Sequence, residues 1–388
     1  MPELPEVESA RCLLEENCVG TTIVEVNATE SGGHARDGLF DDIVFDDKES
    51  SATAVQKALA AKQVVAVRRK GKQLWLQLDR PPHLLAHFGM TGAFVVKGIE
   101  AASYKEFKVH AEEWPPRFTK LELVFSDGAR LAFCDPRRLG RLRLRSDPVN
   151  QDPWHALAPD PLLEPVSVAT AEAVLAKTAK PIKALLLDQS AFVSGVGNWV
   201  ADEVLFQAGI HPEAGCNTLS PAQIQRLHGA LMMVVNVAVG ARAEASQFPD
   251  DWLFHYRWGK GKNGTKVPGA RGGPITFITV GGRTSAVVVS RQRKGEREKG
   301  TSSKPAAAAA SEAPARTKDK KKGQASSQLT SEPESTTLAE PKKQPRAAPV
   351  PSESKGRKRA RSAEAHNMEE EAAVSRAPRQ SRRTRPLA

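Results

Sequence analysis

The first six residues carry the groups with the clearest chemical potential. Removal of Met1 would make Pro2 the first residue, and its nitrogen would then be a secondary amine. An α-amino group has a pKa of about 7.7–8.0, so part of it is uncharged and nucleophilic near neutral pH. Such an amine attacks an aldehyde-like carbon to give an iminium, which drives elimination at the next carbon. The alternative is that Pro2 only starts a helix.

Two carboxylates follow directly. Glu3 and Glu6 are three residues apart at the start of a segment, residues 5–17, whose apolar spacing predicts a helix. Carboxylates are stabilised at a helix N-terminus by the helix dipole. Either one could transfer protons in a reaction at the neighbouring amine. The alternative is that both only complement the dipole.

A second candidate lies in residues 181–212, where an apolar helix is interrupted by Ser194-Gly195-Val196-Gly197 and another opens at Asn198. The glycines permit a tight turn and close approach to a ligand. Free N–H groups at the start of the second helix suit a phosphate. We expect Asn198 to cap this helix and to donate through its side-chain amide. An ordinary helical hairpin is the alternative.

Two further turns, His87–Gly92 and Asp135–Gly140, each place a large residue among small or turn-forming ones. The large residues are Met90 and Leu139, and Arg137 lies beside the latter. An apolar wedge next to an arginine can fill the gap left when a base leaves a DNA stack. The alternative is that Met90 and Leu139 are core residues.

The composition limits the classes of protein. The 388 residues carry a net charge of +11, which favours a polyanionic partner such as nucleic acid. No apolar run is long enough for a transmembrane helix, and the acidic N-terminus is not a secretory signal. The four cysteines have no paired spacing, so we expect buried structural thiols, no thiolate zinc site and no cofactor. They are Cys12, Cys18, Cys134 and Cys216.

Most of the charge belongs to the C-terminal tail. Residues 301–388 have nine Lys and ten Arg against ten Asp and Glu, a net +9, and contain no aromatic residue. Such a segment cannot bury enough apolar surface to fold, so we expect a disordered basic tail over 293–388. It would bind DNA or other polyanions non-specifically. Lys355–Arg361, with five basic side chains, is either a nuclear-localisation signal or a solvated charge run.

Periodicity predicts an all-β half followed by an all-α half, an α+β chain. The expected strands are residues 20–28, 63–69, 72–79, 119–126, 129–134 and 140–145, with a loop over 30–52. A Pro-rich connection over 146–165 leads to expected helices over 168–178, 181–188, 198–208 and 220–241. A β-hairpin with a Gly281-Gly282 turn ends the folded part.

Together these motifs resemble the formamidopyrimidine-DNA glycosylases over residues 1–290. The start PELPEVE is similar to this branch, whereas the related endonuclease VIII branch typically has glycine where Leu4 stands. The missing finger cysteines and the basic tail resemble plant and fungal members. The resemblance implies five regions: an N-terminal catalytic β-sandwich domain preceded by a helix (1–145), a linker (146–165), a helix-two-turn-helix domain (166–242), a loop with a zincless β-hairpin finger (243–292) and the tail (293–388).

The resemblance also implies catalytic roles. Pro2 is similar to the family's Schiff-base nucleophile, and Glu3 to the proton donor that acts at the deoxyribose. Glu6 resembles a supporting carboxylate. Lys72, in Arg-Arg-Lys-Gly-Lys, resembles a strand lysine that contacts phosphate near the lesion.

Five more residues would bind DNA. Asn198 and Arg283 resemble residues that contact phosphates, the second from the finger. Met90 and Arg137 are similar to two members of an intercalating trio. The third position is Leu139, where the family commonly has Phe, which leaves an apolar wedge without a stacking ring.

The function implied is a monomeric bifunctional DNA glycosylase and AP lyase of base excision repair, acting on damaged double-stranded DNA in the nucleus. It would remove oxidised purines, with formamidopyrimidines and abasic sites ranked before 8-oxoguanine, by β,δ-elimination. No membrane association is expected. The alternatives are an oxidised-pyrimidine glycosylase of endonuclease VIII type, a non-catalytic DNA-binding protein, and a chain whose basic tail is the functional element.

Overall fold

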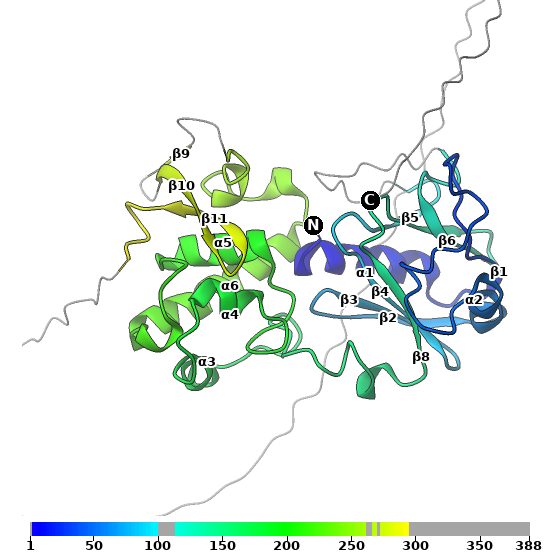
Figure 1. Cartoon of the computed structure of the whole chain (residues 1–388), viewed down its shortest axis with the longest axis horizontal. Helices are drawn as coiled ribbons and strands as arrows, with labels where there is room; N and C mark the ends of the chain where they lie inside the picture. Colours follow the sequence, from blue (N-terminus) through cyan, green and yellow to red (C-terminus); the bar gives the residue numbers. More distant parts are fainter. Residues whose placement is uncertain (1, 100–112, 261–265, 270–271, 295–388) are drawn as a thin grey trace, which may run out of the picture. The chain divides into compact units, whose positions relative to one another are not determined.

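The computed structural model describes residues 2–99, 113–260, 266–269 and 272–294. In these residues a β-rich half precedes a helical half, which confirms the predicted α+β class (Figure 1). The predicted basic tail lies outside the described residues from residue 295 onward, and so does Lys355–Arg361. None of the helices described is long and apolar enough to cross a membrane.

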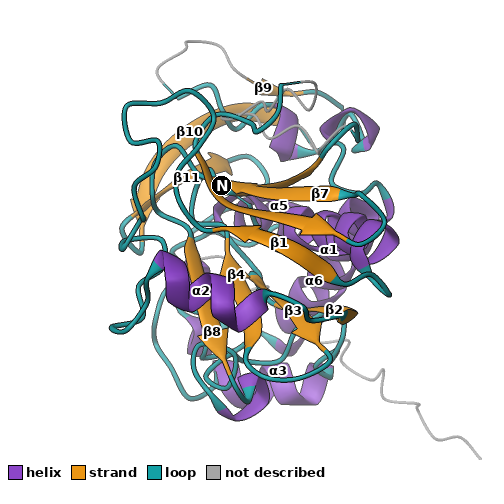
Figure 2. Ribbon diagram, turned by 90° about the vertical axis from the view of Figure 1, so that its right-hand side faces the viewer, coloured by secondary structure: helices purple, strands orange, loops and turns teal. Residues whose placement is uncertain are grey.

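In the residues that the structure describes, the β-rich half has two four-stranded antiparallel sheets, which Figure 2 shows one above the other. The first has the order β1-β6-β7-β5 and the second the order β2-β3-β4-β8. Their bounds are β1 Ile23–Asn27, β2 Val64–Lys70, β3 Gln73–Leu78, β4 His83–His87, β5 Ala93–Val96, β6 Thr119–Phe125, β7 Arg130–Cys134 and β8 Arg141–Arg145. Apolar side chains from both sheets form one core, as expected for a sandwich.

Three elements of this half were not predicted. Helix α2 (Ala52–Leu59) follows the predicted loop, with Ser51 as its N-cap, and buries only Val55 and Leu59. Strands β4 and β5 are the other two. All three are short. Strand β4 pairs with β3 on one side and with β8 on the other, and its sequence does not show the alternation of apolar and polar residues used to predict the other strands.

Helix α1 (Leu4–Cys18) joins the two halves. Leu4 lies in the core of the helical half, whereas Val7, Ala10 and Leu14 lie in the core of the β half. The start of α1 is therefore fixed at the junction between the halves, as Figure 1 shows. Glu3 is the N-cap, and the Glu6 side chain accepts its backbone N–H, as one half of a capping box does.

The helical half contains four α-helices around their own core. Their bounds are α3 Val168–Leu175, α4 Ile182–Leu187, α5 Asn198–Ala208 and α6 Pro221–Gly240, with short 3-10 turns η1 Pro148–Asn150, η2 Cys216–Thr218, η3 Ala245–Gln247 and η4 Leu253–His255. Ser220 and Gln223 form a capping box at α6.

A three-stranded sheet ends the described part: β9 (Lys266–Val267), β10 (Gly273–Val280) and β11 (Arg283–Val288), in the order β11-β10-β9. Gly281 and Gly282 have φ values of 58° and 72°. Positive φ at both positions is what the predicted two-residue primed turn requires.

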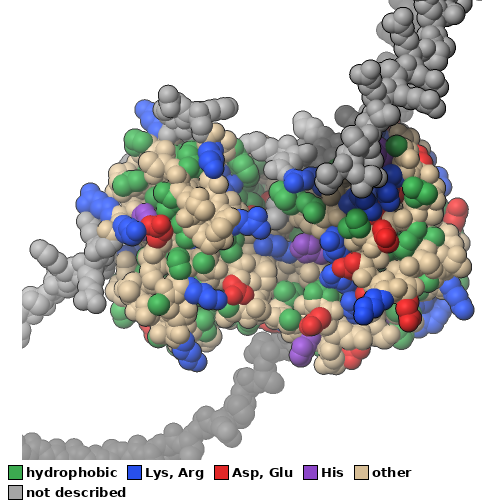
Figure 3. All heavy atoms as spheres, in the orientation of Figure 1, with side chains coloured by type: hydrophobic (Ala, Val, Ile, Leu, Met, Phe, Trp, Pro, Cys, Tyr) green, Lys and Arg blue, Asp and Glu red, His purple; other side chains and the backbone are tan. Residues whose placement is uncertain are grey.

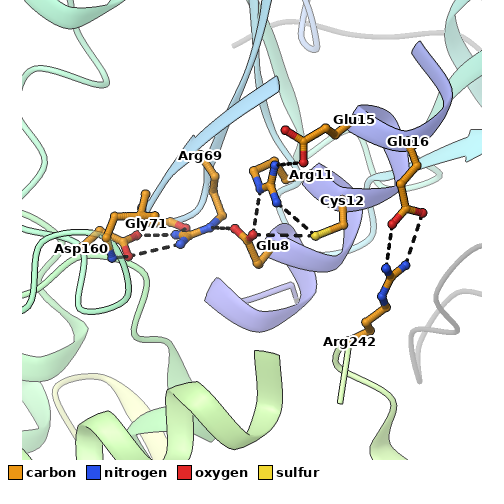
Figure 4. Close-up of polar contacts among 10 residues, drawn as sticks. Glu8, Arg11, Cys12, Glu15, Glu16, Arg69, Gly71, Asp160 and Arg242 are labelled. Atoms are coloured by element: carbon orange, nitrogen blue, oxygen red, sulfur yellow. Dashed lines mark hydrogen bonds and ion pairs between the residues drawn. The ribbon is translucent and has the colours of Figure 1, made fainter. Parts of the chain in front are cut away.

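A fully buried ion network holds the halves together (Figure 4). The Arg69 guanidinium on β2 donates to Glu8 on α1 at 2.7 Å, to the Gly71 carbonyl at 3.0 Å and to both oxygens of Asp160. Asp160 lies in the predicted linker and also accepts the Gly71 N–H at 2.7 Å. The linker is thus anchored to the turn that carries Lys72.

Replacement of Arg69 by Met should lower the free energy of unfolding by about 3–5 kcal/mol, because it leaves the buried Asp160 carboxylate without its cation. Chemical denaturation measures this. The matched control is Arg68→Met on the same strand, where the side chain is exposed and the change should stay within about 0.5 kcal/mol. Equal losses for the two variants would contradict this role for the network.

Candidate active site

A cavity of about 430 Å³ lies at the junction of the two halves. Its walls come from the N-terminus, the β half, α4, the start of α5 and the β10–β11 turn. Five of the predicted site residues line it: Glu3, Lys72, Met90, Asn198 and Arg283. Side chains that are distant in sequence therefore meet at one place.

The Glu3 side chain is buried, and its carboxylate caps α5 across the junction. Oε1 accepts the Trp199 N–H at 2.9 Å and Oε2 accepts the Val200 N–H at 3.0 Å. Only glycine leaves room for this approach, because a Cβ on Gly197 would lie 2.2 Å from the Glu3 carboxyl carbon. The helix N-terminus predicted to suit a phosphate is thus occupied by a side chain of the same protein.

The prediction that Asn198 caps α5 is wrong. The N-cap is Gly197, which makes no side-chain cap, and Asn198 is the first helical residue. Its amide nitrogen donates to the Thr284 carbonyl on β11 at 3.0 Å, and its Oδ1 is buried without a hydrogen-bond partner among the residues that the structure describes. Asn198 therefore connects the β10–β11 hairpin to the first residue of α5.

Glu6 supports this arrangement from the first turn of α1. Its Oε2 accepts the Glu3 backbone N–H at 2.9 Å, and its Oε1 accepts the Trp199 indole N–H at 3.0 Å. Burial, and then the nearby charge of Glu3, raise the pKa of Glu6 to about 7. Glu6 can therefore exchange a proton near neutral pH.

Lys72 approaches the same place from the β2–β3 turn. Its Nζ donates to the Val196 carbonyl at 2.8 Å. Burial lowers the pKa of Lys72, against the opposing effect of the Glu3 and Glu6 carboxylates. The Lys72 amine is therefore uncharged more often than the amine of an ordinary lysine.

Pro2 is buried directly before these groups, although it is not among the residues that line the cavity. The next backbone amides fix its position, since Glu3 N–H binds Glu6 and Leu4 N–H donates to the Gly195 carbonyl at 3.1 Å. Met1 lies outside the described residues. The backbone on the C-terminal side of Pro2 is thus fixed by hydrogen bonds, and Glu3 is the next residue.

The two predicted wedge loops pack against each other. Asp135, fully buried, accepts the Thr91 hydroxyl at 2.7 Å and the Gly140 N–H at 2.6 Å, which joins the loops. Leu139 is 41% exposed, so it is not a core residue, and Met90 is half-buried at the cavity wall. Arg137 is exposed on the same loop as Leu139. The role of Asp135 in joining the two loops was not predicted from the sequence.

A second buried network sets the position of Arg283. Asp202 on α5 accepts the Lys183 ammonium from α4, the Arg257 guanidinium at 2.8 Å and the Ala286 N–H on β11 at 3.2 Å. This places the start of β11, with the exposed Arg283, at the cavity. Among the described residues, no group of three or more His, Cys, Asp and Glu could hold a metal ion.

The structure also adds cavity residues that the sequence analysis did not select. Arg257 and Trp258 follow η4 and line the cavity. The only local signal is an aromatic residue among Gly and basic residues in the segment Tyr-Arg-Trp-Gly-Lys-Gly-Lys.

Known proteins share this architecture. Residues 1–142 match the formamidopyrimidine-DNA glycosylase N-terminal domain, and residues 157–250 match the H2TH domain of the same family. The chain is 42% identical over 301 residues to a formamidopyrimidine-DNA glycosylase from Arabidopsis thaliana, covering 76% of this chain and 71% of that protein. A second such protein, from Enterococcus faecalis, is 36% identical over 248 residues, 62% of this chain and 77% of its own length.

Solved structures agree. The glycosylase of Lactococcus lactis in complex with abasic-site DNA matches with a TM-score of 0.59 and 27% identity over 75% of this chain and 100% of that one. A mutant of the same enzyme with DNA containing Fapy-dG matches with a TM-score of 0.59 and 26% identity, over 76% and 100%. These likenesses confirm the resemblance seen in the sequence. The chain belongs to the formamidopyrimidine-DNA glycosylase family.

Proposed function

We propose that this chain is a bifunctional DNA glycosylase and AP lyase that removes oxidised purines, formamidopyrimidines first, from double-stranded DNA. One observation carries the proposal: the Glu3 carboxylate, one residue after Pro2, meets Lys72, Asn198 and Arg283 at one cavity. A nucleophile, a proton-transfer group and cations for phosphates are the set that this reaction needs.

The chemistry starts once Met1 is removed. The Pro2 nitrogen attacks C1′ of the damaged nucleotide, the glycosidic bond breaks, and the base leaves with its electron pair and takes up a proton. Glu3 exchanges a proton with the deoxyribose as the sugar ring opens to the iminium. Loss of a C2′ proton then expels the 3′ phosphate, and a second elimination expels the 5′ phosphate. Water then hydrolyses the remaining iminium, which frees the Pro2 nitrogen and releases the sugar as an unsaturated aldehyde. The DNA keeps a one-nucleotide gap with phosphate ends.

The surface supports binding to a bent duplex. Leu139 and Met90 stand on the paired loops and would fill the stack that the flipped nucleotide leaves. Arg137 and Arg283 are exposed and would contact the DNA near the lesion. Lys and Arg side chains lie on both halves of the visible face and around the junction between them (Figure 3). The two Lactococcus structures contain abasic-site and Fapy-dG DNA, which are the ligands proposed here.

A panel of defined duplexes tests the function. The damaged positions are formamidopyrimidine, 8-oxoguanine, thymine glycol and an abasic site. We expect excision of formamidopyrimidine and incision of the abasic site to be fastest, each leaving phosphate at both ends of the gap. Faster removal of thymine glycol would instead assign a pyrimidine glycosylase, and binding without cleavage of any duplex would assign a non-catalytic protein.

We also propose that the protein acts in the nucleus, which rests on Lys355–Arg361 alone. Replacement of the five basic residues of this cluster by Gln should move a fluorescent fusion from the nucleus to the rest of the cell. The matched control changes Lys320, Lys321 and Lys322, a second basic run in the tail, and should leave the distribution unchanged. Nuclear accumulation of the first variant would overturn the assignment.

A further inference from the structure

An exposed indole in the cavity wall is not used by the reaction as described above. Trp258 lines the cavity together with Glu3, Gly197 and Arg283, and 38% of its surface is exposed. Indole rings are usually mostly buried in a folded protein. A large aromatic ring that stays accessible inside a concave site is instead suited to stack on a flat ligand.

The ring is held in place by a neighbouring cation. The Arg257 guanidinium lies 4.5 Å from the centroid of Trp258, a cation–π contact. Asp202, fully buried and paired with Lys183, fixes Arg257 through two hydrogen bonds at 3.2 and 2.8 Å. The cation that supports the ring therefore has little freedom to move.

A second contact fixes the edge of the ring. Phe254 meets Trp258 in an edge-to-face arrangement with centroids 5.8 Å apart. Phe254 is itself packed against Trp199 at 5.0 Å, and its N–H donates to Glu203 at 2.8 Å. Because α5 supplies Trp199 and Glu203, the ring is positioned by the same helix that Glu3 caps.

The reacting carbon defines where a base would lie. In the proposed reaction C1′ comes close to the Pro2 nitrogen and to Glu3, and since Glu3 lines the cavity, we place the base attached to C1′ in this cavity. Enzymes that act on a flipped base read it by hydrogen bonds and by stacking on aromatic side chains. Among the described residues, the cavity wall has two aromatic side chains, Trp258 and Trp199, and Trp199 is only 3% exposed.

We propose that Trp258 stacks on the everted base and is a specificity-determining residue of this site. The inference rests on the proposed glycosylase function. It predicts that the contribution of Trp258 depends on whether the nucleotide carries a base, since an abasic nucleotide offers no ring on which Trp258 could stack. Loss of the ring should therefore change the ratio between reactions at a damaged base and at an abasic site.

The test compares Trp258→Ala and Trp258→Phe with the wild-type chain under single-turnover conditions. Trp258→Ala should lower the ratio of formamidopyrimidine excision to abasic-site incision by roughly ten- to a hundredfold, the range of base–aromatic stacking. Trp258→Phe, which keeps a ring, should restore most of it. The matched control is Trp154→Ala, a half-buried indole that packs on Trp75 outside this cavity and should leave the ratio unchanged.

A binding measurement separates this inference from the proposed function. In a Glu3→Gln background, where chemistry is slow, Trp258→Ala should weaken binding of the formamidopyrimidine duplex relative to the abasic duplex. An unchanged binding ratio, or equal losses of both reactions, would overturn the stacking role. A wild-type chain that cleaves neither duplex, while its binding ratio still depends on Trp258, would overturn the enzymatic function and leave the stacking role standing.

Discussion

Replacement of Glu3 by Gln should reduce excision of formamidopyrimidine by roughly two to four orders of magnitude, the usual contribution of a positioned proton-transfer group. The amide cannot exchange the proton that the opening deoxyribose needs. It also presents one accepting oxygen where the carboxylate presents two, so it can cap only one of the Trp199 and Val200 N–H groups. The measurement is a single-turnover excision assay with thermal unfolding recorded in parallel.

The matched control is Glu16→Gln on the same helix. Glu16 is exposed and, within the described part of the chain, forms its ion pair with Arg242 at 2.6 Å, so its replacement should leave excision within about twofold of the wild type. If Glu3→Gln binds the duplex normally and excises the base within a few-fold of the wild-type rate, Glu3 does not transfer the proton.

Retention of Met1 should abolish both base excision and strand cleavage. With Met1 in place the Pro2 nitrogen is a tertiary amide, which is neither basic nor nucleophilic, and no other group of the site replaces it in the proposed reaction. Purified protein that retains Met1 should be inactive, and treatment with a methionine aminopeptidase should restore activity in proportion to the Met1 removed. Comparable activity before and after treatment would exclude Pro2 as the nucleophile.

The sequence predicts local features of this molecule well. Helix α1, the α5 and α6 starts within a residue, and the β10–β11 turn follow from apolar spacing and from Gly or Pro at defined positions. The Gly281-Gly282 turn is a clear case, since both positions require positive φ, which glycine adopts without steric cost. The resemblance to the glycosylases also rests on short motifs that are contiguous in the chain.

Contacts between residues far apart in the sequence could not be predicted. Glu3 caps a helix that begins almost two hundred residues later, and the N-cap of that helix is Gly197 and not the predicted Asn198. Asp160 reads as part of a Pro-rich linker, yet it is fully buried against Arg69. Such partners become visible only when the fold brings separate segments together, because nothing in the local spacing of either residue encodes the other.

Trp258 shows the same limit for function. Its neighbours in sequence are basic and Gly-rich, which indicates a loop and no more. Its position in the cavity depends on Asp202 of α5 and on the aromatic cluster behind it. The chemistry proposed for the N-terminus thus follows from residue types, whereas the position of Trp258 in the cavity wall does not.

The central claim is a covalent bond between the Pro2 nitrogen and C1′ of the damaged nucleotide. Borohydride reduces the iminium to a stable amine, so the protein freed of Met1 and mixed with an abasic duplex should give a trapped conjugate. Tryptic digestion and mass spectrometry then locate the nucleotide. The account predicts attachment to the Pro2 nitrogen within the N-terminal peptide that ends at Arg11. Attachment to Lys72 or to any other residue, or a conjugate formed equally well with Met1 in place, would contradict it.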